Sequence, residues 1–253
     1  MAPAADSTRQ RELFERIHDA YASHYYDRDS MEFRRRFIHG PLWDGLDLDG
    51  KEVADLACGS GANSEALLER FPGVRTTGFD ISEPAVVDYA KRTGRPSHRV
   101  NLTEAGSFEA DFDAAMFIGA LHHCVSDLRA TLANVAAMLR PGGVFMMMEP
   151  NQQYVLDHAR RAWYRNDAYF DAQTERALSH DELVALSREW FDVEWVRWVG
   201  GPAYFLVYNS LIFRIPHPVK RATAPALLRL EASWNKLPGK VIYPYFLARW
   251  RRR

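Results

Sequence analysis

Two acidic residues and two glycines, Asp55, Gly59, Gly61 and Asp80, have a spacing that could bind a nucleoside. Asp55 opens the segment 55–61, and Asp80 follows Gly61 by nineteen residues. Glycines permit a tight turn whose backbone N–H groups approach a ligand closely. An acidic side chain at the end of the next strand can accept hydrogen bonds from both ribose hydroxyls. Because Asp55 would oppose a pyrophosphate but attract an ammonium or sulfonium group, we expect a positively charged nucleoside ligand.

The same segment lacks the features of two phosphate-binding loops. A P-loop needs Gly-Lys-Ser/Thr, which is absent, and a dinucleotide fingerprint needs a third glycine where this chain has Ser64. A nicotinamide-dependent oxidoreductase is therefore a disfavoured alternative. Each feature alone is also common as an ordinary turn or helix cap, so the interpretation depends on their combination.

Four polar residues follow two later apolar strands: His122, His123, Glu149 and Asn151. In an open α/β sheet, ligands bind beyond the carboxyl ends of the strands, so we expect these side chains near a second substrate. A histidine with its ordinary pKa of about 6.5 could act as a general base toward a hydroxyl. The alternative is that one histidine caps a helix and the other packs. Adjacent side chains such as His122, His123 and Cys124 rarely converge on one ion, so no metal is expected.

The elements that must position these residues alternate between short apolar runs and helical segments, which is typical of a doubly wound parallel α/β sheet. Strands are predicted at residues 53–57, 74–79, 98–102, 113–119, 144–148, 193–199 and 241–250, and helices at residues 63–70, after Ser82, and at 126–139 and 179–190. Helical spacing over residues 13–25 predicts a helix ahead of the sheet. We expect an N-terminal helical cap (1–50) and a main domain (51–253), with acceptor-side insertions at 151–180 and 200–240.

Composition restricts the class of protein. The chain has 253 residues, 47% of them hydrophobic and 26% charged, which is the balance of a globular protein. Its two cysteines favour a reducing compartment, and with no signal peptide apparent we expect a cytoplasmic protein. A formal net charge of -1 disfavours a nucleic-acid partner. The longest apolar run, residues 203–213, is too short to cross a bilayer.

Four motifs together resemble the class I S-adenosylmethionine-dependent methyltransferases. They are Val53-Ala54-Asp55-Leu56-Ala57-Cys58-Gly59-Ser60-Gly61, Gly78-Phe79-Asp80-Ile81-Ser82, Phe112-Asp113-Ala114-Ala115 leading to Gly119-Ala120-Leu121-His122-His123, and Leu139-Arg140-Pro141-Gly142-Gly143. The resemblance implies a Rossmann-like sheet of seven strands with the last one antiparallel, and S-adenosylmethionine as cofactor. The implied cofactor-binding residues are Asp55, Ala57, Cys58, Gly59, Gly61, Asp80, Ile81, Asn101, Leu102 and Ile118. Many relatives carry Asp where this chain has Asn101.

The resemblance is to the small-molecule branch of that superfamily, so we expect methyl transfer to a small, largely apolar or aromatic metabolite. Oxygen is the preferred nucleophile because a histidine base has most to offer a hydroxyl; transfer to nitrogen or carbon of a natural-product or lipid-like acceptor is the alternative. A cofactor-binding protein without transferase activity also remains open, whereas RNA methylation is disfavoured by charge. Tyr21, Tyr25, Glu149 and Asn151 are the expected acceptor residues. Residues 203–213, with Arg214 and the basic C-terminus, could make peripheral membrane contact.

Overall fold

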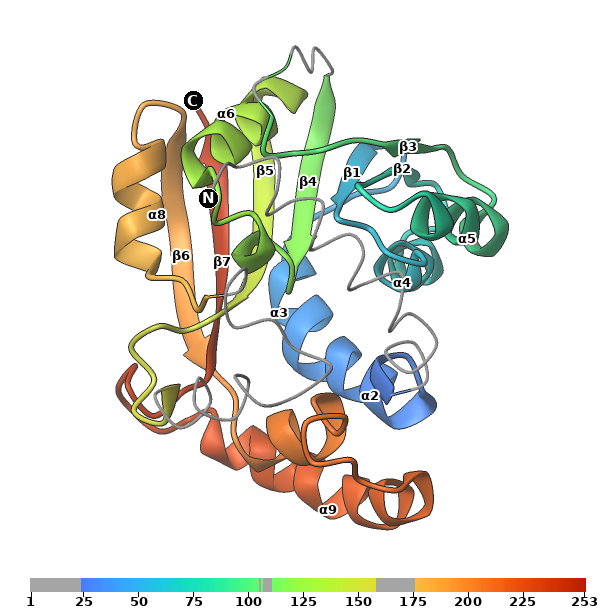
Figure 1. Ribbon diagram of the computed structural model, residues 1–253, viewed down its shortest axis with the longest axis vertical. Coiled ribbons are helices and arrows are strands. Elements are labelled where there is room, and N and C mark those ends of the chain that lie inside the picture. The colour runs from blue at the N-terminus through green and yellow to red at the C-terminus, as the bar shows by residue number, and fades with distance from the viewer. Residues whose placement is uncertain (1–23, 105, 107–110, 158–175) are drawn as a thin grey trace.

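The computed structural model describes residues 24–104, 106, 111–157 and 176–253. These residues form a sheet of seven strands with helices on both of its faces (Figure 1). Its strands are β1 (Glu52–Leu56), β2 (Arg75–Asp80), β3 (Ser97–Arg99), β4 (Phe112–Ile118), β5 (Leu139–Pro150), β6 (Phe191–Val199) and β7 (Tyr245–Arg252). The helices are α2 (Arg28–Arg34), η1 (Arg35–His39), α3 (Gly40–Trp43), α4 (Ala62–Arg70), α5 (Glu83–Thr93), η2 (Leu121–His123), α6 (Leu128–Met138), α8 (His180–Ser187), η3 (Tyr204–Tyr208) and α9 (His217–Trp234).

The strand order is β3-β2-β1-β4-β5-β7-β6. β1 pairs in parallel with β2 and β4, and β4 pairs in parallel with β5. β7 enters between β5 and β6 and runs antiparallel to both. The predicted doubly wound sheet with an antiparallel last strand is therefore confirmed, and the chain reverses its strand order beside β1 and β4, where such sheets bind ligands.

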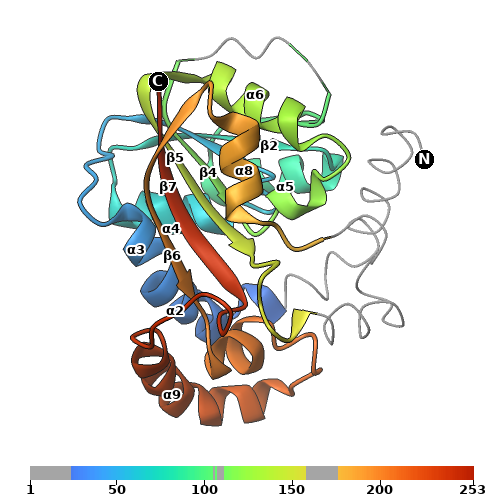
Figure 2. The same cartoon turned by 90° about the vertical axis from the view of Figure 1, so that its left-hand side faces the viewer.

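Two cores cover the two faces of the sheet. Successive side chains of a strand point to opposite faces, so Met116 and Ile118 of β4 pack with α2, α4 and η3, whereas Ala115 and Phe117 pack with α6 and α8. Figure 2 shows α6 and α8 on one side of the strands and α3 and α4 on the other. Burial on both faces explains why the strands are nearly continuous apolar runs in the sequence.

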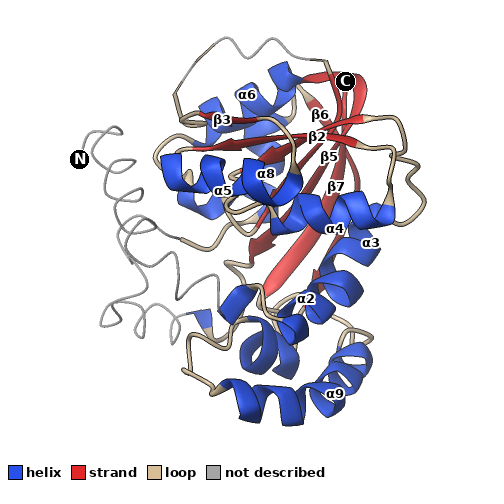
Figure 3. Ribbon diagram, turned by 90° about the vertical axis from the view of Figure 1, so that its right-hand side faces the viewer, coloured by secondary structure: helices blue, strands red, loops and turns tan. Residues whose placement is uncertain are grey.

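The helices α2, η3 and α9 gather beyond the carboxyl ends of the parallel strands (Figures 1 and 3). α2 contacts both η3 and α9, although these helices come from opposite ends of the chain. Asp27 caps α2 by accepting from the backbone N–H groups of Asp29 and Ser30. The layer lies where a second substrate would approach the sheet. Most of the helix expected over residues 13–25 lies outside the described residues.

Two stretches differ from their expected surroundings. The run packs inward over residues 203–212, with Tyr204, Val207 and Tyr208 in the core, and Phe213 at its end is exposed. The C-terminal arginines lie in and directly after β7, and Arg249 and Arg253 pair with acidic side chains of β6. In the part of the chain that the structure describes, no helix has the length and apolar character needed to span a bilayer.

Candidate active site

The glycine-bearing turn joins β1 to α4 in a left-handed backbone conformation. Gly59 and Gly61 have φ angles of 51° and 83°, a region that side chains other than glycine enter at a cost. A Cβ atom on Gly61 would lie 2.9 Å from Thr93 Cγ2 and 2.9 Å from Tyr89 Cδ2. Gly61 is therefore required for the packing of α4 against α5, whereas Gly59 belongs to the wall of a cavity.

Asp80, at the end of β2, holds this turn from the side. Its Oδ2 accepts from Gly59 N at 2.9 Å, and its Oδ1 accepts from Ser82 N at 2.9 Å. Each carboxylate oxygen has more than one lone pair, so both can accept further bonds from a ligand. The two backbone donors fix the carboxylate at the cavity wall without neutralising it.

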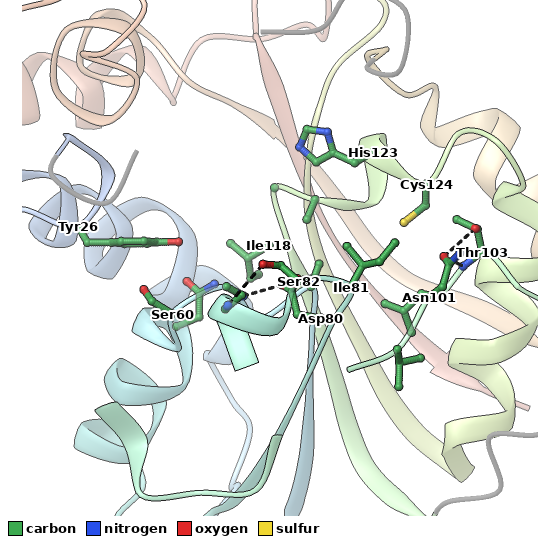
Figure 4. A pocket seen from close by; sticks show the side chains of 18 of the residues that line it. Tyr26, Ser60, Asp80, Ile81, Ser82, Asn101, Thr103, Ile118, His123 and Cys124 are labelled. Atoms are coloured by element: carbon green, nitrogen blue, oxygen red, sulfur yellow. Dashed lines mark hydrogen bonds between the residues drawn. The ribbon is translucent and has the colours of Figure 1, made fainter. Parts of the chain in front are cut away.

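A cavity opens at the carboxyl ends of β1, β2 and β4 and contains both Asp80 and one of the two histidines (Figure 4). Figure 4 shows Tyr26 and Ser60 at one end, Asn101 and Thr103 at the other, and His123 near Cys124 between them, above the strand ends. The residues that line it are Tyr26, Arg34, Ala57, Gly59, Ser60, Asn63, Asp80, Ile81, Ser82, Ala85, Val100, Asn101, Leu102, Thr103, Ile118, Gly119, Ala120, His123 and Cys124. The cavity is thus elongated, with polar groups at both ends.

At one end, Asn101, one of the implied cofactor-binding residues, is hydrogen-bonded within its own loop. Its Oδ1 accepts from Thr103 N at 3.1 Å and from Thr103 Oγ1 at 2.8 Å, and its Nδ2 donates to Glu104 Oε1. The two bonds use both lone pairs of the amide oxygen. Asn101 therefore shapes this end of the cavity, with Ile81 and Leu102 as its apolar walls.

At the other end lies a buried cation that the sequence analysis missed. Arg34 of α2 is 1% exposed, and its guanidinium lies 5.0 Å from the ring centres of both Tyr26 and Tyr208. Its Nη1 donates to Asn63 Oδ1 at 2.8 Å. Oδ1 also accepts from His39 Nε2 at 3.0 Å, and burial lowers the pKa of His39 to about 3, so this imidazole is neutral. The arrangement presents a positive group to the cavity near the glycine turn.

Asp55 lies behind the turn and does not line the cavity. Its Oδ2 accepts from Ser64 Oγ at 2.7 Å, and its Oδ1 is buried with no partner among the described residues. Burial raises the pKa of Asp55 to about 7. Ser60 Oγ, which belongs to the cavity wall, is also buried without such a partner. Two polar atoms beside the glycine turn thus have bonding capacity left for a ligand or a bridging water.

The two adjacent histidines have different surroundings. His123 lines the cavity, whereas His122 lies behind it with its ring centre 3.9 Å from that of His123. His122 Nδ1 is 2.8 Å from Glu149 Oε2. Burial lowers the pKa of His123 well below its ordinary value, so this imidazole is deprotonated at neutral pH. Of the two histidines, His123 is the one placed to accept a proton from a bound molecule.

Glu149 is fully buried and holds the turn that carries these histidines. Its Oε1 accepts from Ala120 N at 3.1 Å and Leu121 N at 2.8 Å, and its Oε2 accepts from His122 N at 3.2 Å. Burial raises the pKa of Glu149 to about 8. The carboxyl group is therefore an internal anchor and does not line the cavity.

Some of the remaining predicted site residues line the cavity and others do not. The implied cofactor residues that line the cavity are Ala57, Gly59, Asp80, Ile81, Asn101, Leu102 and Ile118. Cys58 is buried outside the lining, and Tyr25 packs edge-on against Tyr208. Asn151 donates to the carbonyl oxygens of Lys240 and Tyr243 and so ties two loops together. Tyr21 lies outside the described residues. Within the described residues, no group of three or more His, Cys, Asp or Glu side chains is arranged to hold a metal ion.

Comparisons with known proteins agree with this geometry. Residues 54–145 match the family model of a methyltransferase domain. The phthiotriol/phenolphthiotriol dimycocerosates methyltransferase of Mycobacterium tuberculosis is 28% identical over 62% of this chain and 53% of its own length. The ubiquinone biosynthesis O-methyltransferase of Stutzerimonas stutzeri is 32% identical over 49% of this chain and 57% of its own length. The matches span little more than half of either relative.

Solved structures show the same fold. The N-methyltransferase NodS from Bradyrhizobium japonicum, in complex with S-adenosylhomocysteine, superposes with a TM-score of 0.55 at 14% identity, over 92% of this chain and 97% of NodS. The segment 54–145, which matches the family model, begins in β1 and ends in β5, so it contains the glycine turn, Asp80 and both histidines. Residues 54–145 thus match a methyltransferase domain, and the motifs and the sheet are those of the class I methyltransferases, the superfamily that uses S-adenosylmethionine as methyl donor.

Proposed function

We propose that this chain transfers the methyl group of S-adenosylmethionine to a small, largely apolar or aromatic acceptor, preferably to an oxygen atom. The observation that carries the proposal is that one cavity contains both Asp80 beside the glycine turn and His123. A donor-binding group and a proton acceptor thus line the same space.

The cavity residues suit the donor in both shape and charge. Asp80 would accept from the ribose hydroxyls, and Ile81 and Leu102 would cover the faces of the adenine ring. The guanidinium of Arg34 would pair with the carboxylate of the methionine portion, and Ser60 Oγ has bonding capacity for a polar group of the same portion. When bound, S-adenosylmethionine supplies a methyl group on a positively charged sulfur.

The chain's own contribution to methyl transfer would be positioning and proton removal. Placing two reactants in line and close together supplies several kcal/mol of barrier reduction. His123 is neutral at physiological pH, so it can take the proton of a hydroxyl as the new bond forms. The His122 ring contacts that of His123 at a tilt, and Glu149 fixes His122, so both act as positioning residues.

An apolar acceptor is favoured by the apolar residues that line the same cavity as His123, among them Ile118 and Ala120. The name of one relative places it in ubiquinone biosynthesis as an O-methyltransferase. Preference for oxygen, the acceptor itself, a cytoplasmic location and the domain boundary at residue 50 stay proposals.

The test is transfer of isotope-labelled methyl from S-adenosylmethionine into metabolite extracts, with the product identified by mass. We expect a labelled product of low polarity whose formation requires both Asp80 and His123. Fragmentation distinguishes methylation at oxygen from methylation at nitrogen or carbon. Binding of the donor product without label transfer to any extract fraction would contradict the proposed activity and would favour a binding role.

A further inference from the structure

The outer face of α9 combines exposed apolar side chains with unbalanced positive charge. Val219, Ala222, Ala226 and Leu230 recur at intervals of three and four residues, so they share one face of the helix. All four are exposed, and Val219 and Leu230 retain 51% and 48% of their surface. We call these four residues the α9 stripe.

Further exposed apolar side chains precede and follow the helix in the sequence. Phe213 precedes α9 and is 49% exposed, and Leu237 and Val241 follow it at 46% and 50%. Single exposed apolar residues are ordinary on protein surfaces, but contiguous ones mark interaction sites. The spacing along one element makes this surface distinct from isolated exposed residues such as Val87.

Two buried charges fix the rotation of α9 and keep the stripe outward. Lys220 is 1% exposed, and its Nζ donates to His24 O at 2.8 Å and to Ser210 Oγ at 3.0 Å, and pairs with Asp27. Near the other end, Glu231 is fully buried and accepts from Gly201 N at 2.8 Å and from a second backbone N–H. Rotating the helix to bury the stripe would break both anchors, so its exposure is built into the fold.

Along α9 and the residues that flank it in sequence, every exposed charge is positive. Arg221, Arg229 and Lys236 are exposed on and after α9. Between residues 211 and 244 Glu231 is the single acidic residue, and it points inward. Among the described residues, no acidic side chain forms an ion pair with Arg221 or Arg229. By contrast, Arg249 of β7 pairs with Glu194, and Arg253, directly after β7, pairs with Asp192.

We propose that the α9 stripe and its basic flank dock on an anionic lipid surface. A helix with apolar residues on one side, Lys and Arg beside them and no exposed acid lies in the headgroup region of a bilayer. A flat stripe of alanine, valine and leucine offers no groove for a peptide, whereas a bilayer needs none. The benefit of such docking rests on the proposed function. Because α9 belongs to the layer beyond the carboxyl ends of the strands, docking would bring the cavity's side of the molecule toward an apolar acceptor held in lipid.

The test measures partition of the whole chain onto 100 nm vesicles of phosphatidylcholine with and without phosphatidylglycerol, without donor or acceptor. We expect binding to the anionic vesicles that is lost in 0.5 M salt, and little binding to the neutral ones. Arg221→Gln with Arg229→Gln should weaken the partition constant about 25-fold, because each basic residue near such a surface contributes about fivefold. Leu230→Ser should weaken it about tenfold. The control Lys91→Gln with Arg188→Gln makes the same charge change elsewhere on the exposed surface and should change it less than twofold.

A second readout locates the contact. A polarity-sensitive fluorophore on Leu230→Cys should shift to the blue with anionic vesicles, and the same probe on Lys91→Cys should not. Absence of vesicle binding, an equal effect of the control pair, or an unshifted probe at position 230 would overturn the proposal. Binding to soluble polyglutamate without vesicle binding would assign the face to an acidic protein instead, and a dimer that Leu230→Ser dissociates would assign it to a second copy. None of these results bears on donor binding, which is measured separately.

Discussion

Glu149 Oε2 lies 2.8 Å from His122 Nδ1, and the same carboxyl group accepts three backbone N–H groups of the turn that carries His122 and His123. The end of β5 therefore sets the position of a group at the end of β4. We expect Glu149→Gln to present an amide N–H to a backbone N–H. The clash should reduce the free energy of unfolding by about 1–3 kcal/mol and lower the melting temperature by several degrees. An unchanged melting temperature would contradict the anchoring role.

His123→Ala tests the proposed proton acceptor. Removing a general base costs about 10²- to 10⁴-fold in rate, so kcat should fall by that range. Affinity for S-adenosylhomocysteine, measured by calorimetry, should stay within about twofold because Asp80, and not His123, is the proposed donor-binding group. His122→Ala is the matched comparison and should reduce kcat less, since this ring is behind the cavity. If His122→Ala lost more activity than His123→Ala, the two roles would be reversed.

The pH dependence of His123 follows from its burial. Its pKa lies well below the ordinary value, so the ring stays deprotonated as the pH falls through 6. With an acceptor hydroxyl that remains protonated over the range, kcat should therefore be nearly constant between about pH 6 and 8. A loss of kcat with an apparent pKa near 6.5 would show that an imidazole with an ordinary pKa, and not His123 as placed here, takes the proton.

Arg34 can be tested by comparing two ligands that differ in the amino-acid portion. S-Adenosylhomocysteine carries a carboxylate and 5′-methylthioadenosine does not. We expect Arg34→Lys to weaken the binding of S-adenosylhomocysteine about tenfold or more, because the planar fork of the guanidinium is lost. The binding of 5′-methylthioadenosine should stay nearly unchanged. Asp80→Asn should weaken both ligands, since both contain the ribose. Equal losses for both ligands in Arg34→Lys would mean that the guanidinium supports the fold and not the ligand.

Glu231 makes stability depend on pH. Burial raises its pKa to about 7 from an ordinary value of 4.5. Between these values the folded chain keeps a proton that the unfolded chain has released, so this contribution to stability falls as the pH rises through the window. Relative to Glu231→Gln, the wild type should lose about 2–3 kcal/mol of unfolding free energy between pH 4.5 and pH 7.5. Denaturant titrations measure it, with the exposed Glu83→Gln as the variant that should parallel the wild type. A constant difference between wild type and Glu231→Gln would refute the raised pKa.

The sequence brings Gly59 and Asp80 to one cavity, as the structure does, because the signals for both are local. Gly59 and Asp80 each stand at the end of a short apolar strand, and parallel strands bring such ends to one edge of the sheet. The seven-stranded sheet and its antiparallel last strand were implied by the resemblance and are confirmed.

The rest depends on contacts between distant segments. Arg34 sits in a run of three arginines that reads as a solvated surface, and its burial arises only when Tyr26 and Tyr208 close over it. Glu149 was expected to face an acceptor but is an anchor, because its carboxyl group is turned toward η2. Apolar periodicity could not distinguish residues 203–212, which pack inward, from α9, whose stripe is exposed.

The central claim is that this cavity binds S-adenosylmethionine, and calorimetric titration with S-adenosylhomocysteine and with NAD tests it most directly. We predict one site per chain for S-adenosylhomocysteine, weakened on the order of 100-fold in Asp80→Asn, and no detectable binding of NAD. Tighter binding of NAD than of S-adenosylhomocysteine would contradict the account. So would a titration in which neither ligand gives a binding heat that Asp80→Asn reduces.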